Sequence, residues 1–446
     1  MPDGARSADP AVQRQLDRLA ALGLGADVLG LERIRALLVR LGNPEEALPP
    51  VFHVAGTNGK GSTCAFLRAA LEASGRTVHV FASPHLVRFN ERIRLGGRLI
   101  ADEALASYLS RVLDVAGRGA DAIGPSFFEA TTAAALLAFA ETPADACVIE
   151  VGLGGRLDAT NVVPAPVVTG IAQLALDHQA FLGDRPEQIA AEKAGIAKPH
   201  VPLVTQRYAT QPAERIAAAA AAVDAPWLPR GGAWDAAAYQ GRVRYRDMAG
   251  RLDLPLPRLA GAHQVLNAGL AVAMLRHQHA LHVPEAALKA AMGWAEWPAR
   301  MQRLGAGPLA ALLPQDAELW LDGGHNPAAA RVVADHLRAA APAGKPLHIV
   351  LGLLANKDAT GVLHAFAGRQ LTVHAVPVPG HAFHAPAELV RIARANGLTA
   401  RTAQAVPDAL GWIGRHADAA EPPFVLVMGS LYLAGEVLAA NGQPPD

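Results

Sequence analysis

Short apolar segments alternate with longer segments of helical periodicity through the first 200 residues. One helical segment places Leu31, Ile34, Leu37, Leu38 and Leu41 three or four positions apart, on one face. This alternation is typical of βα units on a mostly parallel sheet. The predicted strands are Val51–Ala55, Val78–Ala82, Cys147–Val151, Val167–Ala172 and Pro202–Thr205.

The pattern changes in the middle of the chain. The short segments Arg242–Arg246 and Leu252–Leu256 predict a small antiparallel sheet, and Ala262–His277 predicts a helix after it. We interpret Trp294–Arg300 as a hinge, because the alternation of strands and helices returns after it. The expected strands of this second region are Leu319–Leu321, His348–Leu351, Val373–Val376 and Phe424–Met428. Two α/β domains are therefore expected, residues 1–296 and a smaller 297–446.

Two further helices carry local signals. Asp184 followed by Pro186 and Glu187 predicts a capped helix that ends at Gly195. Lys193 falls in the last turn of this helix, where a lysine usually interacts with the helix dipole. The alanine run 217–222 is interpreted as a plain helix.

Charge and composition narrow the class of protein. Lys plus Arg and Asp plus Glu each total 40, a balance that argues against a nucleic-acid-coating or membrane-surface protein. Although 51% of residues are hydrophobic, we find no apolar stretch long enough to span a membrane. Two cysteines and an N-terminus without an apolar signal core favour the reducing cytoplasm.

The sharpest motif follows the strand Val51–Ala55 and precedes a predicted helix. Its residues are Gly56, Thr57, Asn58, Gly59, Lys60, Gly61 and Ser62. Glycines expose backbone N–H groups to a phosphate, Lys60 adds a charge and Ser62 a hydroxyl for Mg²⁺. We interpret the motif as a phosphate loop, although a glycine separates its lysine from its serine.

Polar residues also follow the other strands of the same predicted sheet. Ser83, Glu150, Asp177 and His178 would meet at its carboxyl edge, where open α/β sheets bind ligands. Together they suit a divalent cation, although each singly could be a turn, surface or loop residue.

In the second domain Asp322-Gly323-Gly324-His325-Asn326-Pro327 follows a strand, with Asn326 and Pro327 expected to initiate a helix. Asp322, His325 and Arg300 from the hinge would face the same space.

Other clusters are weaker. His277, His279 and His282 do not share a helix face, and His381 and His384 lie in an expected loop, so we predict no metal site in either place. The basic residues Arg88, Arg92 and Arg94 favour a small anionic substrate.

These motifs resemble those of folylpolyglutamate synthases, whose bacterial members are often also dihydrofolate synthases, within the Mur ligase superfamily. The matching segments are VAGTNGKGSTC (Val54–Cys64), SPHLVRFNERI (Ser83–Ile93), EVGLGGRLDATN (Glu150–Asn161), LDH with LG (Leu176–His178, Leu182–Gly183), EKAGIAK (Glu192–Lys198), WPARMQ (Trp297–Gln302) and DGGHNP (Asp322–Pro327). The resemblance implies a P-loop-type parallel sheet in the N-terminal domain and a Rossmann-like C-terminal domain. It further implies a monomeric amide ligase that uses ATP and two Mg²⁺ ions to join L-glutamate to dihydropteroate or reduced folates through an acyl phosphate.

Residue roles follow from the same resemblance. Nucleotide positions are Thr57, Asn58, Gly59, Lys60, Gly61, Ser62, Asn267, Arg300 and Asp322. Magnesium positions are Ser62, Ser83, Glu150, His178 and Lys193, the last as a carbamate. Pterin positions are Leu29, Gly30, Leu31, Ser126, Phe127, Phe128, Glu129, Leu157, Asp158 and Ala159. Lys60, His178, Lys193 and His325 are the implied catalytic residues.

The chain departs from the family pattern in two places: Gln179-Ala180-Phe181 replaces Thr-Asp-Trp beside His178, and Ala299 replaces glycine before Arg300. Alternatives are another Mur-type ligase acting on a cell-wall precursor, a folylpolyglutamate synthase without dihydrofolate synthase activity, and a non-catalytic nucleotide switch.

Overall fold

The computed structural model describes residues 5–22, 29–117, 121–340, 345–418 and 420–446. The chain forms two compact units, which we call the N-terminal unit (Met1–Arg258, Gln264–Glu296 and Asp446) and the C-terminal unit (Leu259–His263 and Trp297–Pro445). Among the described residues, none of the helices is both long and apolar enough to cross a membrane.

An eight-stranded sheet in the order β4-β3-β2-β5-β1-β6-β7-β8 organises the N-terminal unit. Its strands are β1 (Val51–Ala55), β2 (Val78–Phe81), β3 (Ile93–Leu95), β4 (Arg98–Leu99), β5 (Ala146–Glu150), β6 (Val168–Ile171), β7 (Leu203–Thr205) and β8 (Trp227–Pro229). The six strands β2, β5, β1, β6, β7 and β8, which are adjacent in this order, pair in parallel. Strands β3 and β4 extend the sheet beyond β2 as antiparallel edge strands. The carboxyl ends of β2, β5, β1 and β6 are therefore neighbours.

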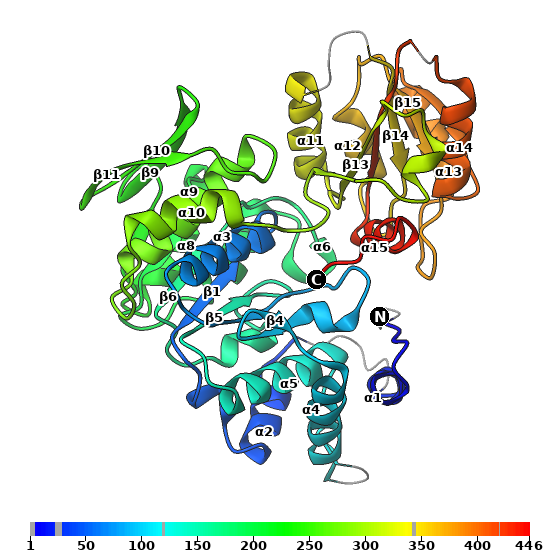
Figure 1. The fold of residues 1–446 in the computed structure, drawn as a ribbon. Helices are drawn as coiled ribbons and strands as arrows, with labels where there is room; N and C mark the ends of the chain where they lie inside the picture. Colours follow the sequence, from blue (N-terminus) through cyan, green and yellow to red (C-terminus); the bar gives the residue numbers. More distant parts are fainter. Residues whose placement is uncertain (1–4, 23–28, 118–120, 341–344, 419) are drawn as a thin grey trace. The chain divides into compact units, whose positions relative to one another are not determined.

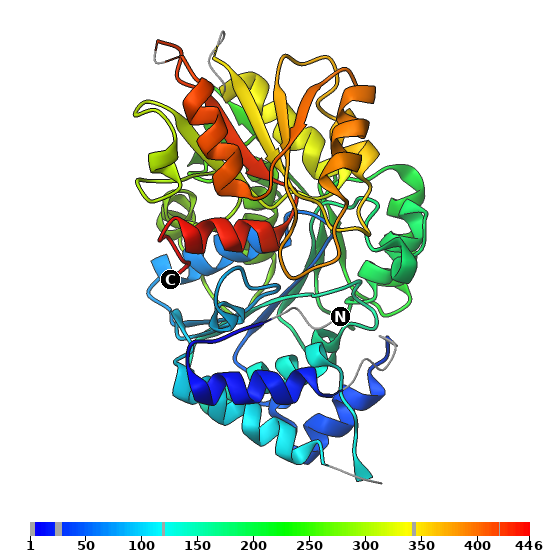
Figure 2. The same cartoon turned by 90° about the vertical axis from the view of Figure 1, so that its right-hand side faces the viewer.

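Helices cover both faces of this sheet (Figure 1). The helices of this unit are α1 (Pro10–Ala20), α2 (Glu32–Arg40), α3 (Lys60–Ala73), α4 (Asp102–Val115), α5 (Phe127–Glu141), α6 (Gln179–Leu182), α7 (Pro186–Ala194), α8 (Thr210–Ala221), α9 (His263–His277) and α10 (Glu285–Trp294). Residues of α1, α2, α4 and α5 share one apolar core with Val51, Phe81 and Ile149 of the strands. Figure 2 shows α1 lying along α4 in this layer.

A three-stranded antiparallel sheet, β9 (Trp234–Tyr239), β10 (Arg242–Asp247) and β11 (Gly250–Pro255), lies beside α9 and α10 (Figure 1). The C-terminal unit has its own sheet in the order β12-β13-β17-β14-β15-β16, parallel except for β12. Its strands are β12 (Gln302–Arg303), β13 (Glu318–Asp322), β14 (Leu347–Leu351), β15 (Thr372–Ala375), β16 (Thr399–Thr402) and β17 (Phe424–Met428).

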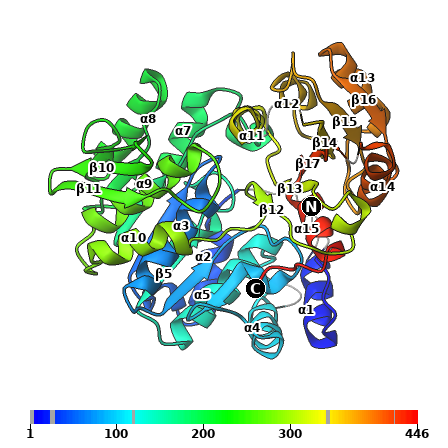
Figure 3. The same ribbon diagram turned by 45° about the horizontal axis from the view of Figure 1, so that its top comes forward.

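Helices also cover both faces of the C-terminal sheet (Figure 3). Its helices are α11 (Pro327–Ala340), α12 (Ala359–His364), α13 (Pro386–Ala395), α14 (Val406–His416) and α15 (Leu431–Ala440). The first three share a core with Ile349, Val373 and Phe424, whereas Trp412 of α14 packs against His374, which points to the other face of β15.

The structure confirms the predicted strands to within a residue or two and the antiparallel excursion between the two α/β regions. The predicted cap of α7 is wrong. The helix begins at Pro186, so Arg185 occupies the cap position, and the Arg185 N–H donates to Gln188 Oε1 at 3.2 Å. Proline fixes the backbone of the first helical residue, which makes Gln188 rather than Glu187 the third residue of the helix.

Candidate active site

The phosphate loop joins β1 to α3 and is fastened to the segment that follows β6. The Thr57 N–H donates to the Gln173 carbonyl at 2.9 Å. Thr57 Oγ1 donates to the Ala175 carbonyl at 3.0 Å and accepts from its N–H at 3.1 Å. Lys60 Nζ donates to the Gly56 carbonyl at 3.1 Å, across the loop. The conformation of the loop therefore depends both on β1, which it follows in the chain, and on the segment after β6.

Asn267 of α9 lies directly against this loop. Gly59 has a φ of 87°, and a Cβ there would lie 2.4 Å from Asn267 Oδ1. Asn267 Nδ2 in turn donates to Gln264 Oε1 at 2.9 Å, which fixes the amide orientation. The structure thus brings Asn267 to the phosphate loop from 208 residues further along the chain.

The proposed metal ligands follow neighbouring strands. Ser62 lies in the first turn of α3 and Ser83 follows β2, while Glu150 ends β5 and is 5% exposed. His178 precedes α6 in a left-handed conformation, with a φ of 52° and a side chain that is 44% exposed. A hydroxyl, a carboxylate and an imidazole suit a divalent ion. Within the described ranges, however, no three His, Cys, Asp or Glu side chains are gathered closely enough to form a metal site by themselves.

Lys193 is buried near the end of α7, with 4% of its surface exposed. Burial and, second to it, the charge of Lys60 lower its pKa to about 7, although the carboxylates of Asp177, Asp158 and Glu192 act to raise it. Lys193 therefore lies within electrostatic reach of the phosphate loop. Its amine carries a neutral fraction near pH 7 that an ordinary lysine lacks.

Residues 152–162, which we call the 152–162 segment, pack against the end of α7. The Arg156 N–H donates to the Glu192 carbonyl at 2.8 Å, and Asn161 Nδ2 donates to the Gly195 carbonyl at 3.0 Å. A Cβ on Gly155 would lie 2.9 Å from the Lys193 carbonyl oxygen, so only glycine allows this approach. The segment thereby fixes the backbone that carries Lys193.

Asp158, one of the predicted pterin positions, is buried inside this segment. Its Oδ2 accepts from the Leu153 N–H at 2.8 Å, and its Oδ1 accepts from the N–H and hydroxyl of Thr160 at 3.0 and 2.5 Å. Burial raises the pKa of the Asp158 carboxyl, although these hydrogen bonds act to lower it. The carboxylate organises its own loop, while Leu157 and Ala159 flank it.

The other predicted pterin positions lie at two helix starts. Leu29, Gly30 and Leu31 precede α2. Ser126 and Glu129 cap α5 reciprocally, and Arg33 Nε lies 3.0 Å from Glu129 Oε2. The ring of Phe128 packs on Phe81 and that of Phe127 on Phe89, both with centroids 5.9 Å apart.

The predicted basic surface after Ser83 needs a correction. Arg92 is 1% exposed, its Nε donates to His85 Nδ1 at 2.9 Å, and its guanidinium lies over the rings of Phe89 and Phe127. His85 and Phe89 are buried with it, so the Arg92 guanidinium packs on aromatic side chains and does not face a substrate from the solvent.

In the C-terminal unit Asp322 organises the loop after β13. Its two oxygens accept from the Met301 N–H at 2.8 Å and the Gly324 N–H at 2.7 Å. Arg300 Nη1 lies 2.8 Å from where a Gly323 Cβ would be, and His325 Nδ1 donates to the Gly323 carbonyl at 2.9 Å. The three predicted residues therefore gather within this unit, and Asn326 caps α11 as expected.

Comparison with known proteins decides the family. The model described as "Dihydrofolate synthetase, C-terminal domain" matches residues 309–440. The Escherichia coli K12 dihydrofolate synthase/folylpolyglutamate synthase is 34% identical over 411 residues, covering 92% of this chain and 90% of that protein. This chain belongs to the folylpolyglutamate and dihydrofolate synthase family.

Solved structures agree with the family. E. coli FolC in complex with DHPP and ADP has a TM-score of 0.85 and 32% identity, and covers 97% of both chains. A bifunctional folylpolyglutamate synthase/dihydrofolate synthase with Mn, AMPPNP and L-glutamate bound has a TM-score of 0.84 and 31% identity, covering 97% of this chain and 99% of that one.

Sequence reasoning missed one contributor to this site. Gln173 holds the phosphate loop through a backbone carbonyl, which no side-chain motif reveals. Asp177 was expected at the carboxyl edge of the sheet, but its effect on Lys193 was not: its side chain is 7% exposed, and its charge raises the pKa of that lysine.

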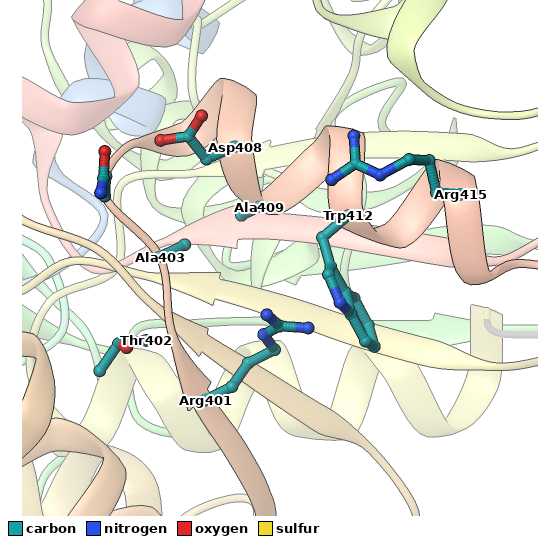
Figure 4. A pocket seen from close by; sticks show the side chains of 8 residues that line it. Arg401, Thr402, Ala403, Asp408, Ala409, Trp412 and Arg415 are labelled. Carbon is teal, nitrogen blue, oxygen red and sulfur yellow. The ribbon is translucent and has the colours of Figure 1, made fainter.

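A separate cavity of about 350 Å³ lies between β16 and α14 in the C-terminal unit (Figure 4). The guanidinium of Arg401 stacks 3.8 Å above the ring of Trp412 in its wall. None of the residues predicted for the synthase site lines it. Its lining residues are Arg401, Thr402, Ala403, Gln404, Asp408, Ala409, Trp412 and Arg415.

Proposed function

We propose that this synthase uses ATP to join L-glutamate to dihydropteroate, to reduced folates or to both. The observation that carries the proposal is the phosphate loop, closed by Asn267 and placed beside the buried Lys193. The relatives support it, because their structures hold ADP with DHPP, and AMPPNP with Mn and L-glutamate.

In the proposed reaction a substrate carboxylate oxygen attacks the γ-phosphorus of ATP, and ADP leaves. The amine of L-glutamate then attacks the acyl carbon, and inorganic phosphate leaves as the amide forms. Lys60 and the N–H groups at the start of α3 stabilise the charge on the transferred phosphoryl oxygens. Positioning and charge neutralisation provide most of the catalysis.

Divalent ions supply charge compensation at the phosphates when bound. We propose Ser62, Ser83, Glu150 and His178 as their ligands. A carbamate on Lys193 would give a second ion an anionic ligand. On the C-terminal unit, Arg300, Asp322 and His325 are proposed to contact the nucleotide. Because one chain supplies every proposed ligand, we propose that the active unit is a monomer. The molar mass measured by light scattering under turnover conditions would test this proposal.

ADP release tests the function. Dihydropteroate and tetrahydrofolate are supplied in parallel, each with and without L-glutamate. Glutamate-dependent ADP release with either acceptor is expected, and the two arms separate dihydrofolate synthase from folylpolyglutamate synthase activity. If no arm releases ADP in response to glutamate, the proposed function is wrong.

A further inference from the structure

A buried histidine in β1 connects the strand of the phosphate loop to the 152–162 segment. His53 is 0% exposed, and its Nε2 lies 2.8 Å from Thr160 Oγ1. The Thr160 hydroxyl has one proton and gives it to Asp158 Oδ1 at 2.5 Å. It must therefore accept from His53, so the imidazole carries its proton on Nε2.

The protonation state of His53 is constant over the working range. Burial, with a smaller contribution from the charge of Lys198, lowers its pKa to about 3. The imidazole is neutral and remains a donor through Nε2. The hydrogen bonds run in one direction, from His53 to Thr160 to Asp158, and end at a carboxylate that also accepts from the Leu153 N–H.

These hydrogen bonds stabilise the conformation of the 152–162 segment. Without the His53 donor, the Thr160 hydroxyl is free to rotate, and Asp158 loses a fixed partner for a buried charge. The 152–162 segment carries Leu157, Asp158 and Ala159, which the family resemblance assigns to the pterin. It also contacts the end of α7, and Lys198 Nζ donates to its Asn161 carbonyl at 2.9 Å.

We propose that His53 is a positioning residue for the pteroate substrate, acting through Thr160 and Asp158 on the 152–162 segment. This inference rests on the proposed function, but it concerns a side chain that touches neither substrate nor nucleotide. Because His53 precedes Gly56 by only three residues, a merely structural role would disturb the phosphate loop first, and ATP binding would weaken. A positioning role would instead weaken pteroate binding.

Two substitutions separate these roles. His53→Met fills a similar volume without a donor, whereas His53→Gln can present an N–H near the Nε2 position. We expect H53M to raise the KM for dihydropteroate about tenfold, as expected for one lost buried hydrogen bond. The KM for ATP should change less than about twofold, and H53Q should recover most of the loss.

His79→Met is the matched control. His79 is also a fully buried strand histidine, but its Nε2 donates to the Thr142 carbonyl at 2.9 Å and its ring stacks on Phe139, away from the segment. H79M should leave the ratio of the two KM values unchanged. Equal rises in both KM values for H53M, or the same ratio in H53M and H79M, would overturn the inference.

Amide hydrogen exchange keeps the inference testable if the wild-type chain shows no ligase activity, an outcome that counts against the proposed function alone. In H53M the Leu153 and Thr160 amides should exchange faster than in wild type, while the β5 amides stay protected. Unchanged exchange at these two amides would show that His53 does not hold the segment.

Discussion

Gly59 illustrates how one residue decides the shape of the phosphate loop. Its positive φ is costly for other residues, by about 1–2 kcal/mol, and a Cβ would also displace the Asn267 amide. We expect Gly59→Ala to weaken ADP binding at least tenfold, about 1.4 kcal/mol, measured by calorimetry.

Gly75 supplies the control for this substitution. It has a similar φ of 83°, but nothing lies within 4 Å of an added Cβ. Gly75→Ala should lower stability by the backbone strain alone and leave ADP affinity unchanged. Equal ADP affinities in the two variants would mean that the contact with Asn267 does not shape the loop.

Lys193 gives a second prediction, which tests its proposed role as a carbamate. We expect Lys193→Ala to reduce ligation at least about 100-fold, because a proposed metal ligand and a buried charge partner are lost together. Removing CO₂ should slow the wild-type synthase, and added bicarbonate should restore it but not the variant. Near-normal turnover of K193A would exclude the carbamate.

Lys193 also marks a limit of sequence reasoning at this scale. Its place in the last turn of a helix was correctly predicted from the sequence, and that position alone favoured an interaction with the helix dipole. The 152–162 segment packs against the Lys193 backbone, so closely that a Cβ on Gly155 would lie 2.9 Å from the Lys193 carbonyl oxygen. Such a contact between distant segments leaves no local pattern.

At the scale of elements, the strands that carry the site were predictable because each is a short, mostly apolar segment before a polar turn. The order β2-β5-β1-β6 was not, although it decides which polar residues become neighbours. The two-residue strands β4 and β12 are too short to show a period, so they escaped prediction.

The three-stranded sheet gives a prediction for a pair of elements. Asp247 of β10 accepts from Arg276 Nε and Nη2 of α9 at 2.6 and 2.8 Å and from the Tyr245 hydroxyl at 3.0 Å. Its side chain is 1% exposed. We expect Asp247→Asn to lower the free energy of unfolding by about 3 kcal/mol, since it leaves a largely buried arginine without its counter-charge.

The same carboxylate predicts a pH dependence. Burial would raise the pKa of Asp247, but Arg276 outweighs it, and the pKa lies below the usual value. The stability difference between wild type and D247N should therefore be complete above about pH 4 and shrink as the pH falls through the folded pKa. Asp253→Asn, with a side chain 65% exposed beside Arg244, should change stability by less than about 0.5 kcal/mol at any pH. Denaturant titrations of D247N and D253N over a range of pH would measure these differences. The same pH dependence of the free energy of unfolding in both variants would contradict the role of the Asp247–Arg276 pair.

At the scale of the molecule, the metal is expected to serve the reaction and not the fold. No preassembled cluster of His, Cys, Asp or Glu is found in the described part of the chain. Chelation should therefore abolish turnover yet shift the Tm of the nucleotide-free protein by less than about 2 °C, the shift that roughly 1 kcal/mol produces at this size. A large fall in Tm would indicate a structural ion.

The hydrogen bonds between Thr57 and Ala175 join residues 118 positions apart. A ribosome must therefore make β2, β5 and β6 before the phosphate loop, among the first elements synthesised, can take its final form. Nascent chains that end before Gln173 would lack the carbonyl that accepts from the N–H groups of Thr57 and Asn58. We therefore expect the phosphate loop to bind a nucleotide only after the ribosome has made β6 and the turn that follows it.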